Sequence, residues 1–346
     1  MSVRIFFENI IHGRSHPVIL VPVRALLLPL SLCFATVSFL RNMLYDLHIL
    51  KQHVLPVPVI SVGNITVGGT GKTPAAVMLL EHFRKEGRKT ALLARNYGSG
   101  EKDLNDELSM IREQFPDIII VPGHDRTDSG LKAVEQGAEL IILDDGFQHR
   151  KLHRICDILT VDSRTESGIH FLLPAGPFRE MRGSGKRADI ILMTKCESNT
   201  DTGTQRDTDT ASPSLFRSRH KPACLRGQSG EKISGYLNEK KVFLFCGIGD
   251  PGYFSETVAG CGADIKGHRF FPDHHAYTQK EIEAVIRDAE ACSAEIIVCT
   301  EKDMTKAAPL FKNSKNNIEF SALSITIEIL DDEKLFWDII HECIAE

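Results

Sequence analysis

Apolar and polar positions follow two successive patterns along this chain. From Val57 to Lys195, short runs rich in Val, Ile and Leu are separated by longer stretches with helical spacing. Continuous apolar runs of this kind are typical of parallel strands that helices cover on both faces. We therefore expect strands within residues 57–63, 90–95, 117–122, 138–145, 157–162 and 188–195.

A second α/β pattern follows a polar stretch. Residues 197–214 contain almost nothing that can enter a core, which predicts a flexible loop. The predicted fold class is α/β, with a larger parallel-sheet domain at 56–225 and a smaller α/β domain at 226–346, both preceded by a separate segment at 1–55. In the smaller domain we expect strands within residues 241–246, 262–271, 295–300 and 318–327, and a helix from about Asp332.

The segment at 1–55 is strongly apolar. Arg24 is the one charge between Pro17 and Leu40, and the uncharged run from Ala25 would span roughly 24 Å as a helix, short of the ~30 Å hydrocarbon core of a bilayer. Beyond Pro29, apolar and polar residues separate onto opposite sides at helical spacing. The pattern predicts an amphipathic helix, which either docks on the protein's own core or lies in one leaflet of a membrane.

The charge balance also sets the N-terminal segment apart. The chain has 346 residues and a net charge of −5, but residues 1–60 hold five basic and two acidic side chains, a net +3, so the remainder stands at −8. A basic, apolar segment suits an anionic membrane surface, and the lack of a basic stripe elsewhere argues against a nucleic-acid binder. The nine cysteines form no Cys-x-x-Cys pair, which is typical of a reducing compartment.

The turn after the first expected strand has the composition of a phosphate-binding loop, although the usual motif has a glycine where this chain has Thr66. Glycines let backbone N–H groups approach phosphate oxygens, and the start of the next helix adds partial positive charge. Lys72 can then reach the β- and γ-phosphates, and Thr73 can ligate Mg²⁺. The sequence predicts a nucleotide site formed by Thr66, Gly68, Gly69, Thr70, Gly71, Lys72 and Thr73.

Acidic residues follow two of the expected strands. Asp144 and Asp145 end an apolar run, and two such acids are costly to bury unless a cation neutralises them. They are candidate Mg²⁺ ligands, with an exposed strand-end turn as the alternative. Asp106, with Glu107 beside it, lies near a helix start, where it is either a general base for an acceptor hydroxyl or a helix cap.

The second domain carries a polar loop, Asp273-His274-His275, just before an expected capping box from Thr278 to Glu281. A histidine that reaches across the interdomain cleft to hold a carboxylate is one interpretation, and an ordinary loop histidine is the other. Residues 247–252 formally match Gly-x-Gly-x-x-Gly, but no acid-tipped strand follows about twenty residues on, so we interpret them as a tight turn.

Several of these motifs together resemble the tetraacyldisaccharide 4′-kinases, the lipid A 4′-kinases of Gram-negative bacteria. The resemblance runs from the apolar N-terminal helix to the Thr300–Asp303 loop and implies transfer of the γ-phosphoryl group of ATP to the 4′-hydroxyl of a tetraacyldisaccharide 1-phosphate, giving lipid IV-A. The stretches that carry it are the loop from Gly63 to Pro74, Asp144-Asp145-Gly146-Phe147-Gln148-His149-Arg150, Leu173-Pro174-Ala175-Gly176-Pro177-Phe178-Arg179-Glu180 and Phe271-Pro272-Asp273-His274-His275.

The resemblance implies a location and a set of ligands as well. The enzyme would be peripheral and monotopic on the cytoplasmic face of the bacterial inner membrane, with ATP and Mg²⁺ as cofactors. Its partners would be the lipid A disaccharide 1-phosphate precursor and the membrane surface, and no obligate protein partner is expected. Lys72 and Thr73 would serve the nucleotide and the metal ion, and Asp144 and Asp145 the metal ion.

On the acceptor side, the resemblance implies that Asp106 is the base, that His274 orients it across the cleft, and that the second domain closes over the active site. Departures from the family pattern, Ala94 and Asn96 in the preceding loop and Leu108 where a proline is usual, concern the geometry around Asp106. Further residues implied to line the active site are Glu107, Gln148, His149, Arg179 and Glu180.

The residues alone leave a second function open, a nucleotide-dependent switch or GTPase that binds a partner protein and turns over slowly without a phosphoryl acceptor. Preference for GTP over ATP and partner-stimulated hydrolysis would distinguish it from a kinase.

Overall fold

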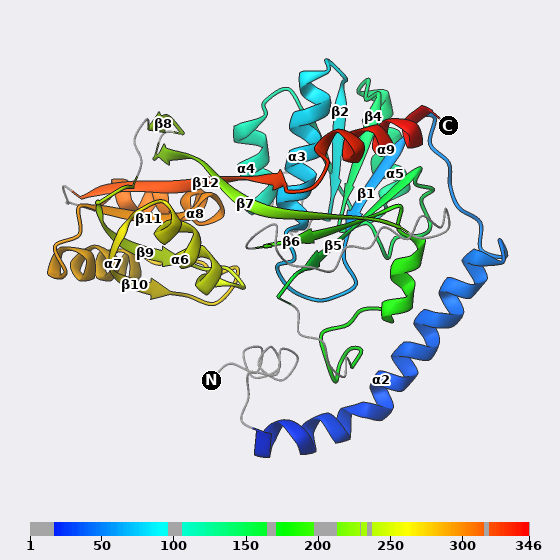
Figure 1. Cartoon of the computed structure of the whole chain (residues 1–346), viewed down its shortest axis with the longest axis horizontal. Coiled ribbons are helices and arrows are strands. Elements are labelled where there is room, and N and C mark those ends of the chain that lie inside the picture. Colours follow the sequence, from blue (N-terminus) through cyan, green and yellow to red (C-terminus); the bar gives the residue numbers. More distant parts are fainter. Residues whose placement is uncertain are drawn as a thin grey trace. The chain divides into compact units, whose positions relative to one another are not determined.

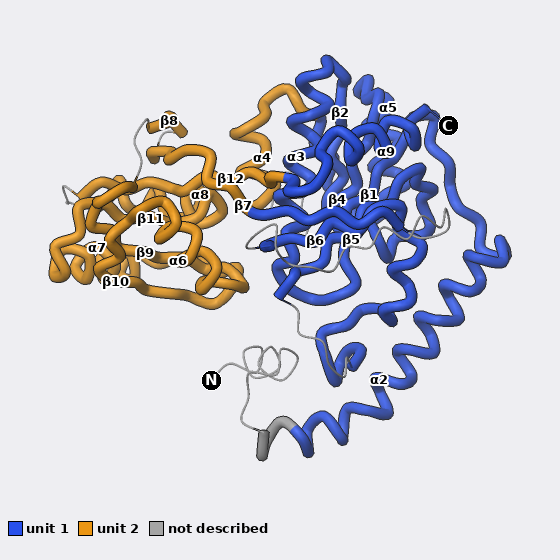
Figure 2. The backbone as a smooth tube through the Cα atoms, in the orientation of Figure 1, with its two compact units in different colours: residues 1–95, 119–219, 329–346 blue, residues 96–118, 220–328 orange. Residues whose placement is uncertain are grey.

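The computed structural model describes residues 17–95, 106–164, 171–196, 213–228, 230–233, 237–314 and 318–345, with only the backbone at 17–20 and at Asp106. The chain divides into two compact units (Figure 2). Unit 1 takes in residues 1–95, 119–219 and 329–346, and unit 2 takes in residues 96–118 and 220–328. The helix that begins at Asp106 therefore belongs to unit 2, although the sequence pattern placed it in the first domain.

Unit 1 is built on a parallel sheet in the order β7-β6-β5-β1-β4-β2-β3 (Figure 1). Every residue of β1, β2 and β4 is buried, so both faces of the sheet are covered, as the apolar runs predicted. The strands are β1 (Val59–Gly63), β2 (Thr90–Ala94), β3 (Ile119–Pro122), β4 (Leu140–Asp144), β5 (Cys156–Asp162), β6 (Ile190–Thr194) and β7 (Ser214–Gly227). The helices include α3 (Lys72–Lys85), α5 (Arg126–Glu135), α9 (Glu333–Ala345) and the 3-10 helix η1 (Arg182–Arg187).

Strand β7 lies where the sequence pattern predicted only a connection between domains. Basic residues are frequent along it and Pro222 lies inside it, so it has neither the continuous apolar run nor the composition of a buried strand. Its pairing comes from distant parts of the chain: it lies beside β6, and Arg217 donates through its guanidinium to Asp331 at 2.7 Å. The predicted fold class is confirmed, while this strand was missed.

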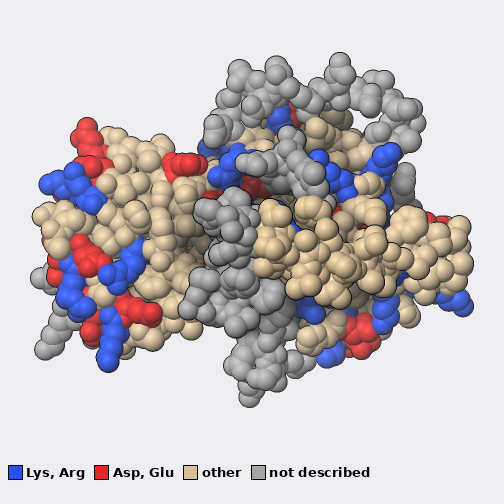
Figure 3. Space-filling view, turned by 90° about the horizontal axis from the view of Figure 1, so that it is seen from below, with Lys and Arg blue, Asp and Glu red and all other residues tan. Residues whose placement is uncertain are grey.

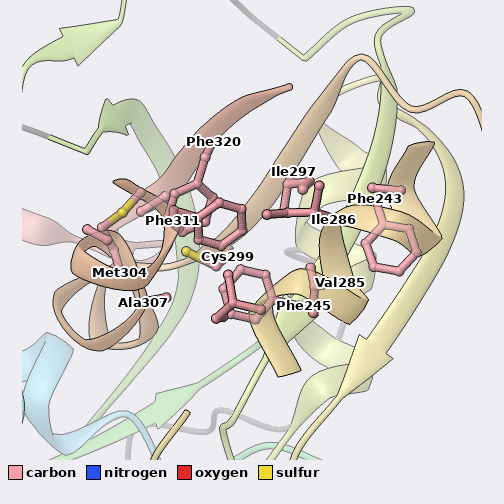
Figure 4. Close-up of a cluster of buried hydrophobic side chains, with 14 residues drawn as sticks. Phe243, Phe245, Val285, Ile286, Ile297, Cys299, Met304, Ala307, Phe311 and Phe320 are labelled. Carbon is pink, nitrogen blue, oxygen red and sulfur yellow. The ribbon is translucent and has the colours of Figure 1, made fainter. Parts of the chain in front are cut away.

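Unit 2 is a smaller α/β unit with the strand order β10-β9-β11-β12-β7 and β8 antiparallel to β7. Its core includes Phe245, Phe311 and Phe320, with the last two rings stacked at 3.7 Å between centroids (Figure 4). The strands are β8 (Lys232–Ile233), β9 (Lys241–Cys246), β10 (Asp264–Phe270), β11 (Ile296–Thr300) and β12 (Glu319–Ile329). The helices are α4 (Asp106–Gln114), α6 (Pro251–Gly260), α7 (Gln279–Ala291) and α8 (Glu301–Lys312), and α7 begins with the predicted capping box.

The N-terminal helix α2 (Pro17–Asp46) has an inverted pattern of burial. Its buried residues are small or polar, namely Ser31, Ala35 and Asn42, whereas Leu26 and Leu32 are 78% and 70% exposed. Figure 3 shows this face of the molecule as a band largely without charged residues. Among the described residues, α2 is the one helix long and apolar enough to cross a membrane by length and composition. Its apolar side is therefore not the side that docks on unit 1.

Candidate active site

The loop between β1 and α3 has the backbone of a phosphate-binding loop. Gly68 and Gly71 have φ angles of 124° and 81°, a region that side-chain-bearing residues rarely adopt, and Gly71 is the N-cap of α3. Thr66 instead forms an isolated antiparallel bridge with Phe178, and the Val67 N–H donates to Pro177 O at 2.7 Å. The missing glycine is explained, because the chain at Thr66 is paired like a strand and does not turn there.

Buried hydrogen bonds connect this loop to the strands of the sheet. The side-chain amide of Asn64 donates to the Thr70 hydroxyl at 2.9 Å, and that hydroxyl lies 2.9 Å from the Thr160 hydroxyl, which donates to Gly63 O at 3.1 Å. The Thr194 hydroxyl donates to Thr70 O at 3.0 Å. Sequence reasoning missed Thr160 and Thr194, since a threonine within or at the end of a strand is an ordinary strand residue.

The side chains of Lys72 and Arg179 both contact the Asp145 carboxylate. Arg179 Nη1 lies 2.8 and 2.9 Å from the two oxygens of Asp145, and Lys72 Nζ lies 3.6 Å from one of them. Burial alone would raise the pKa of Asp145, but Lys72 and Arg179 hold it below its usual range. Gln148 accepts from Arg179 at 3.4 Å and donates to Asn64 O at 2.8 Å. The structure thus brings together Lys72, Asp145, Gln148 and Arg179, and their predicted roles at the active site stay a prediction.

The oxygen atoms next to Lys72 suit a magnesium ion. Thr73 follows Lys72 at the start of α3, and Asp144 and Asp145 follow each other at the end of β4, where Asp144 accepts from the Asp145 backbone N–H at 2.9 Å. Carboxylate and hydroxyl oxygens are the ligands that Mg²⁺ prefers, and Asp145 is ionised because its pKa is lowered. The donor set therefore fits the predicted ion.

Glu180 faces a different part of unit 1. It is 1% exposed and accepts two hydrogen bonds from the Arg187 guanidinium, at 2.8 and 3.0 Å. Asn42 of α2 donates to the same carboxylate at 2.8 Å. These contacts tie α2 to unit 1, and the predicted contact of Glu180 with substrate stays a prediction.

His149 lies among basic groups. Burial and the nearby Arg126 guanidinium lower its pKa to about 4, so its imidazole is neutral near pH 7. Its Nε2 atom is buried without a hydrogen-bond partner among the described residues. A neutral ring with an unused acceptor or donor is compatible with the predicted role at the substrate, which stays a prediction.

In unit 2, the Lys302 side chain contacts two predicted acceptor-side residues, Glu107 and His274, and also Asp273. Its ammonium group lies 3.5 Å from Glu107 Oε1, 3.1 Å from Asp273 Oδ1 and 3.3 Å from His274 Nε2. The Asp106 side chain lies outside the described residues. Since α4 and His274 belong to the same unit, the expectation that His274 reaches from another domain is wrong. Lys302 itself was not among the predicted site residues, although it lies in the Thr300–Asp303 loop that carried part of the resemblance.

Asp303, fully buried, anchors the loops around this cluster. It accepts from the Tyr277 hydroxyl and the Thr300 hydroxyl, both at 2.7 Å, and from the Gly247 N–H at 3.1 Å. Burial, followed by the Asp303 charge, raises the pKa of Tyr277. The turn at 247–252 leads from β9 into α6, and Asp250 caps that helix, so the glycine pattern is a tight turn as interpreted.

Comparison with known proteins identifies the family. The profile of the tetraacyldisaccharide-1-P 4′-kinases matches residues 23–345. The chain is 37% identical to the tetraacyldisaccharide 4′-kinase of Syntrophus aciditrophicus over 84% of its length and 86% of the relative. It is 33% identical to that of Chlorobaculum tepidum over 92% of its length and 95% of the relative.

A solved structure agrees. LpxK of Aquifex aeolicus, crystallised in complex with ATP, superposes with a TM-score of 0.73 and 30% identity, covering 93% of this chain and 99% of that one. Together with the loop, the strand-end acids and the paired Arg179, these likenesses lead to one conclusion: the chain belongs to the tetraacyldisaccharide-1-P 4′-kinase family.

Proposed function

We propose that this protein transfers the γ-phosphoryl group of ATP to the 4′-hydroxyl of a tetraacyldisaccharide 1-phosphate, the step of lipid A biosynthesis that yields lipid IV-A. The single observation that carries the proposal is the Lys72–Asp145–Arg179 cluster above the glycine loop in a chain of this family. The ATP held by the Aquifex aeolicus relative supports the choice of nucleotide.

Unit 1 supplies the groups that hold a triphosphate. Lys72 and Arg179 carry two positive charges against the one negative charge of Asp145, so the cluster has positive charge to spare for phosphate oxygens. When phosphates take up Lys72, one cation fewer competes for the Asp145 carboxylate, which still contacts Arg179 through both oxygens. Mg²⁺ held by Thr73, Asp144 and Asp145 would neutralise charge that builds up on the phosphates during transfer.

Unit 2 supplies the groups for the acceptor. We assign Asp106 as the base that takes the proton of the 4′-hydroxyl, and His274 as the residue that orients it. Lys302 Nζ lies 3.3 Å from His274 Nε2 and 3.1 Å from Asp273 Oδ1, so these contacts hold the imidazole in a defined place beside α4. Glu107 shares Lys302 with His274 and helps to hold this arrangement.

Helix α2 gives the protein a means of reaching a lipid acceptor. We propose that its exposed apolar side lies in the cytoplasmic leaflet of the bacterial inner membrane, while Ser31 and Asn42 fasten its other side to unit 1. Arg24 and Arg41 lie near the protein side, against the Phe171 ring and Glu180, and are placed to meet headgroups at the edge of the helix. Large exposed apolar surfaces usually mark a contact with a membrane or a partner, and a kinase that acts on a soluble acceptor would not need one.

The test is an acceptor-dependent phosphorylation assay. Purified protein, ATP, Mg²⁺ and detergent-solubilised disaccharide 1-phosphate should give a bisphosphorylated lipid, detected by mass. Asp106→Asn should abolish product while leaving ATP binding near the wild-type level. Phosphate release that needs no acceptor and prefers GTP would instead indicate a nucleotide switch and contradict the proposal.

A further inference from the structure

The C-terminal end of α3 carries a cluster of ligand-type side chains that the kinase reaction does not use. His82 and Glu86 are four residues apart and therefore lie on one side of the helix end. His341 comes from α9, which runs beside α3 in unit 1 (Figure 1). At about 1.5 Å per residue, His82 lies roughly 15 Å along α3 from Lys72, so the cluster is separate from the nucleotide loop.

Three ligand atoms of this cluster converge on one point. His82 Nε2 lies 3.3 Å from Glu86 Oε1, His341 Nε2 lies 3.1 Å from the same oxygen, and the two Nε2 atoms are 3.5 Å apart. In a tetrahedral site with bonds of about 2.0–2.1 Å, neighbouring ligand atoms are about 3.3–3.4 Å apart. The triangle thus already has the edge lengths that tetrahedral coordination requires.

Hydrogen bonds from the two imidazoles to Glu86 account for the positions of these three atoms less well than a bound ion does. A carboxylate offers two oxygens, so two imidazoles that each needed an acceptor could use separate ones. Here both Nε2 atoms point to one oxygen and approach each other, which brings two N–H groups together if both are protonated there. An ion at the centre removes that conflict, because each Nε2 then contributes a lone pair.

The surroundings suit a metal ion as well. Two imidazoles and one carboxylate are a common zinc set that leaves a fourth position for water. Glu86 is exposed and both histidines are half-buried, so an ion can enter from solvent. The Trp337 ring stacks on His82 with 3.5 Å between centroids and 3° between planes, which fixes the orientation of the imidazole.

We propose that His82, Glu86 and His341 bind a divalent transition-metal ion of the zinc type and thereby clamp the C-terminal helix α9 onto the end of α3. The bond set joins residues 259 positions apart in the chain. Such a link stabilises the folded state because the ion binds the folded chain and not the separated helices.

Trp337 provides the measurement, since it is the single tryptophan of the chain and stacks directly on a proposed ligand. Full-length protein with reduced thiols and excess Mg²⁺, but no ATP, is titrated with Co²⁺, whose unfilled d shell quenches nearby indole emission. We expect saturable quenching at one equivalent, reversal by Zn²⁺, and a rise in melting temperature of several degrees with Zn²⁺.

Variants locate the site. His341→Gln should weaken Co²⁺ quenching at least about tenfold and remove the Zn²⁺-dependent rise in melting temperature, whereas His341→Asp, which restores a ligand, should recover part of both. His153→Gln, another histidine of unit 1, and Lys72→Met, at the nucleotide loop, should respond like wild type. Absence of saturable quenching in folded wild-type protein, or equal affinity in wild type and His341→Gln, would overturn the proposal.

Discussion

Each unit of this protein holds a lysine among acidic side chains, and the two clusters differ in their balance of charge. Lys72 and Lys302 are similarly covered, with side chains 16% and 14% exposed. Lys72 shares the Asp145 carboxylate with Arg179, whereas Lys302 faces the carboxylates of Glu107 and Asp273 and the His274 ring. At Asp145 two cations meet one carboxylate, which suits a triphosphate, and at Lys302 two carboxylates meet one ammonium group, which suits the removal of a proton from a hydroxyl.

The largest expected effect comes from removing the cation of the first cluster. Lys72→Met should lower the rate of phosphoryl transfer on the order of 10³-fold, because a fixed charge at the transferring phosphate is lost. Lys151→Met is the matched control: this lysine pairs with Asp125 at 2.6 Å on the exposed side of unit 1 and should leave the rate near wild type. Steady-state kinetics would contradict the comparison if both variants lost activity equally.

Removing the cation of the second cluster should have a smaller and different effect. Lys302→Met should lower kcat on the order of 10²-fold through misplacement of His274 and Glu107. The KM for ATP should stay close to wild type, since surplus negative charge does not bind phosphates. A large rise in this KM with unchanged kcat would show that Lys302 serves the nucleotide.

The rigidity of the first cluster can be tested through stability. Thr160→Val keeps the shape of the side chain but leaves the Thr70 hydroxyl and Gly63 O without their buried partner. We expect a loss of about 1–3 kcal/mol in the free energy of unfolding, measured by urea denaturation. The control is Thr257→Val. The Thr257 hydroxyl donates to a carbonyl of its own helix, so its loss should lower the free energy of unfolding far less. Equal losses in the two variants would contradict the role given to the Thr160 hydrogen bonds.

The smallest effect concerns pH. The folded-state pKa of His149 is about 4, below the ordinary 6.5, so the unfolded chain binds the proton more readily. Its contribution to stability is therefore complete above about pH 6.5 and is lost as the pH falls toward 4. His149→Gln should flatten the decline in melting temperature between pH 7 and 5. An unchanged slope in His149→Gln would contradict the positive surroundings assigned to this side of unit 1.

The sheet and the nucleotide loop could be predicted because their signals are local. Continuous apolar runs revealed the strands. Lys72 begins the helix that follows β1, and Asp144 and Asp145 lie at the end of the neighbouring strand β4, so the parallel sheet brings them to one edge. Arg179 and Gln148 were predicted as site residues only through the family resemblance, because no local sequence pattern indicates that they contact residues far along the chain.

Other features depend on contacts between distant segments and were out of reach. The assignment of α4 to unit 2 follows from its packing on α8, and the role of Lys302 follows from partners in α4 and in the loop that holds Asp273 and His274. Strand β7 pairs with β6 although its sequence is rich in basic residues and contains a proline. The apolar periodicity of α2 was visible, but which side faces the protein depends on Ser31 and Asn42 finding partners at Leu172 and Glu180.

The proposed position of the apolar side of α2 in a membrane leaflet would have a kinetic consequence. An enzyme and an acceptor that both reside in one leaflet meet by lateral diffusion, so their encounter frequency depends on molecules per unit of surface and not on bulk concentration. Added detergent or inert lipid should then slow turnover at constant total acceptor, as the two become spread over a larger area. In the proposed membrane arrangement, the polar contacts of α2 with the rest of unit 1 would also fix the tilt of this unit against the surface, so that encounters would begin from a restricted range of orientations.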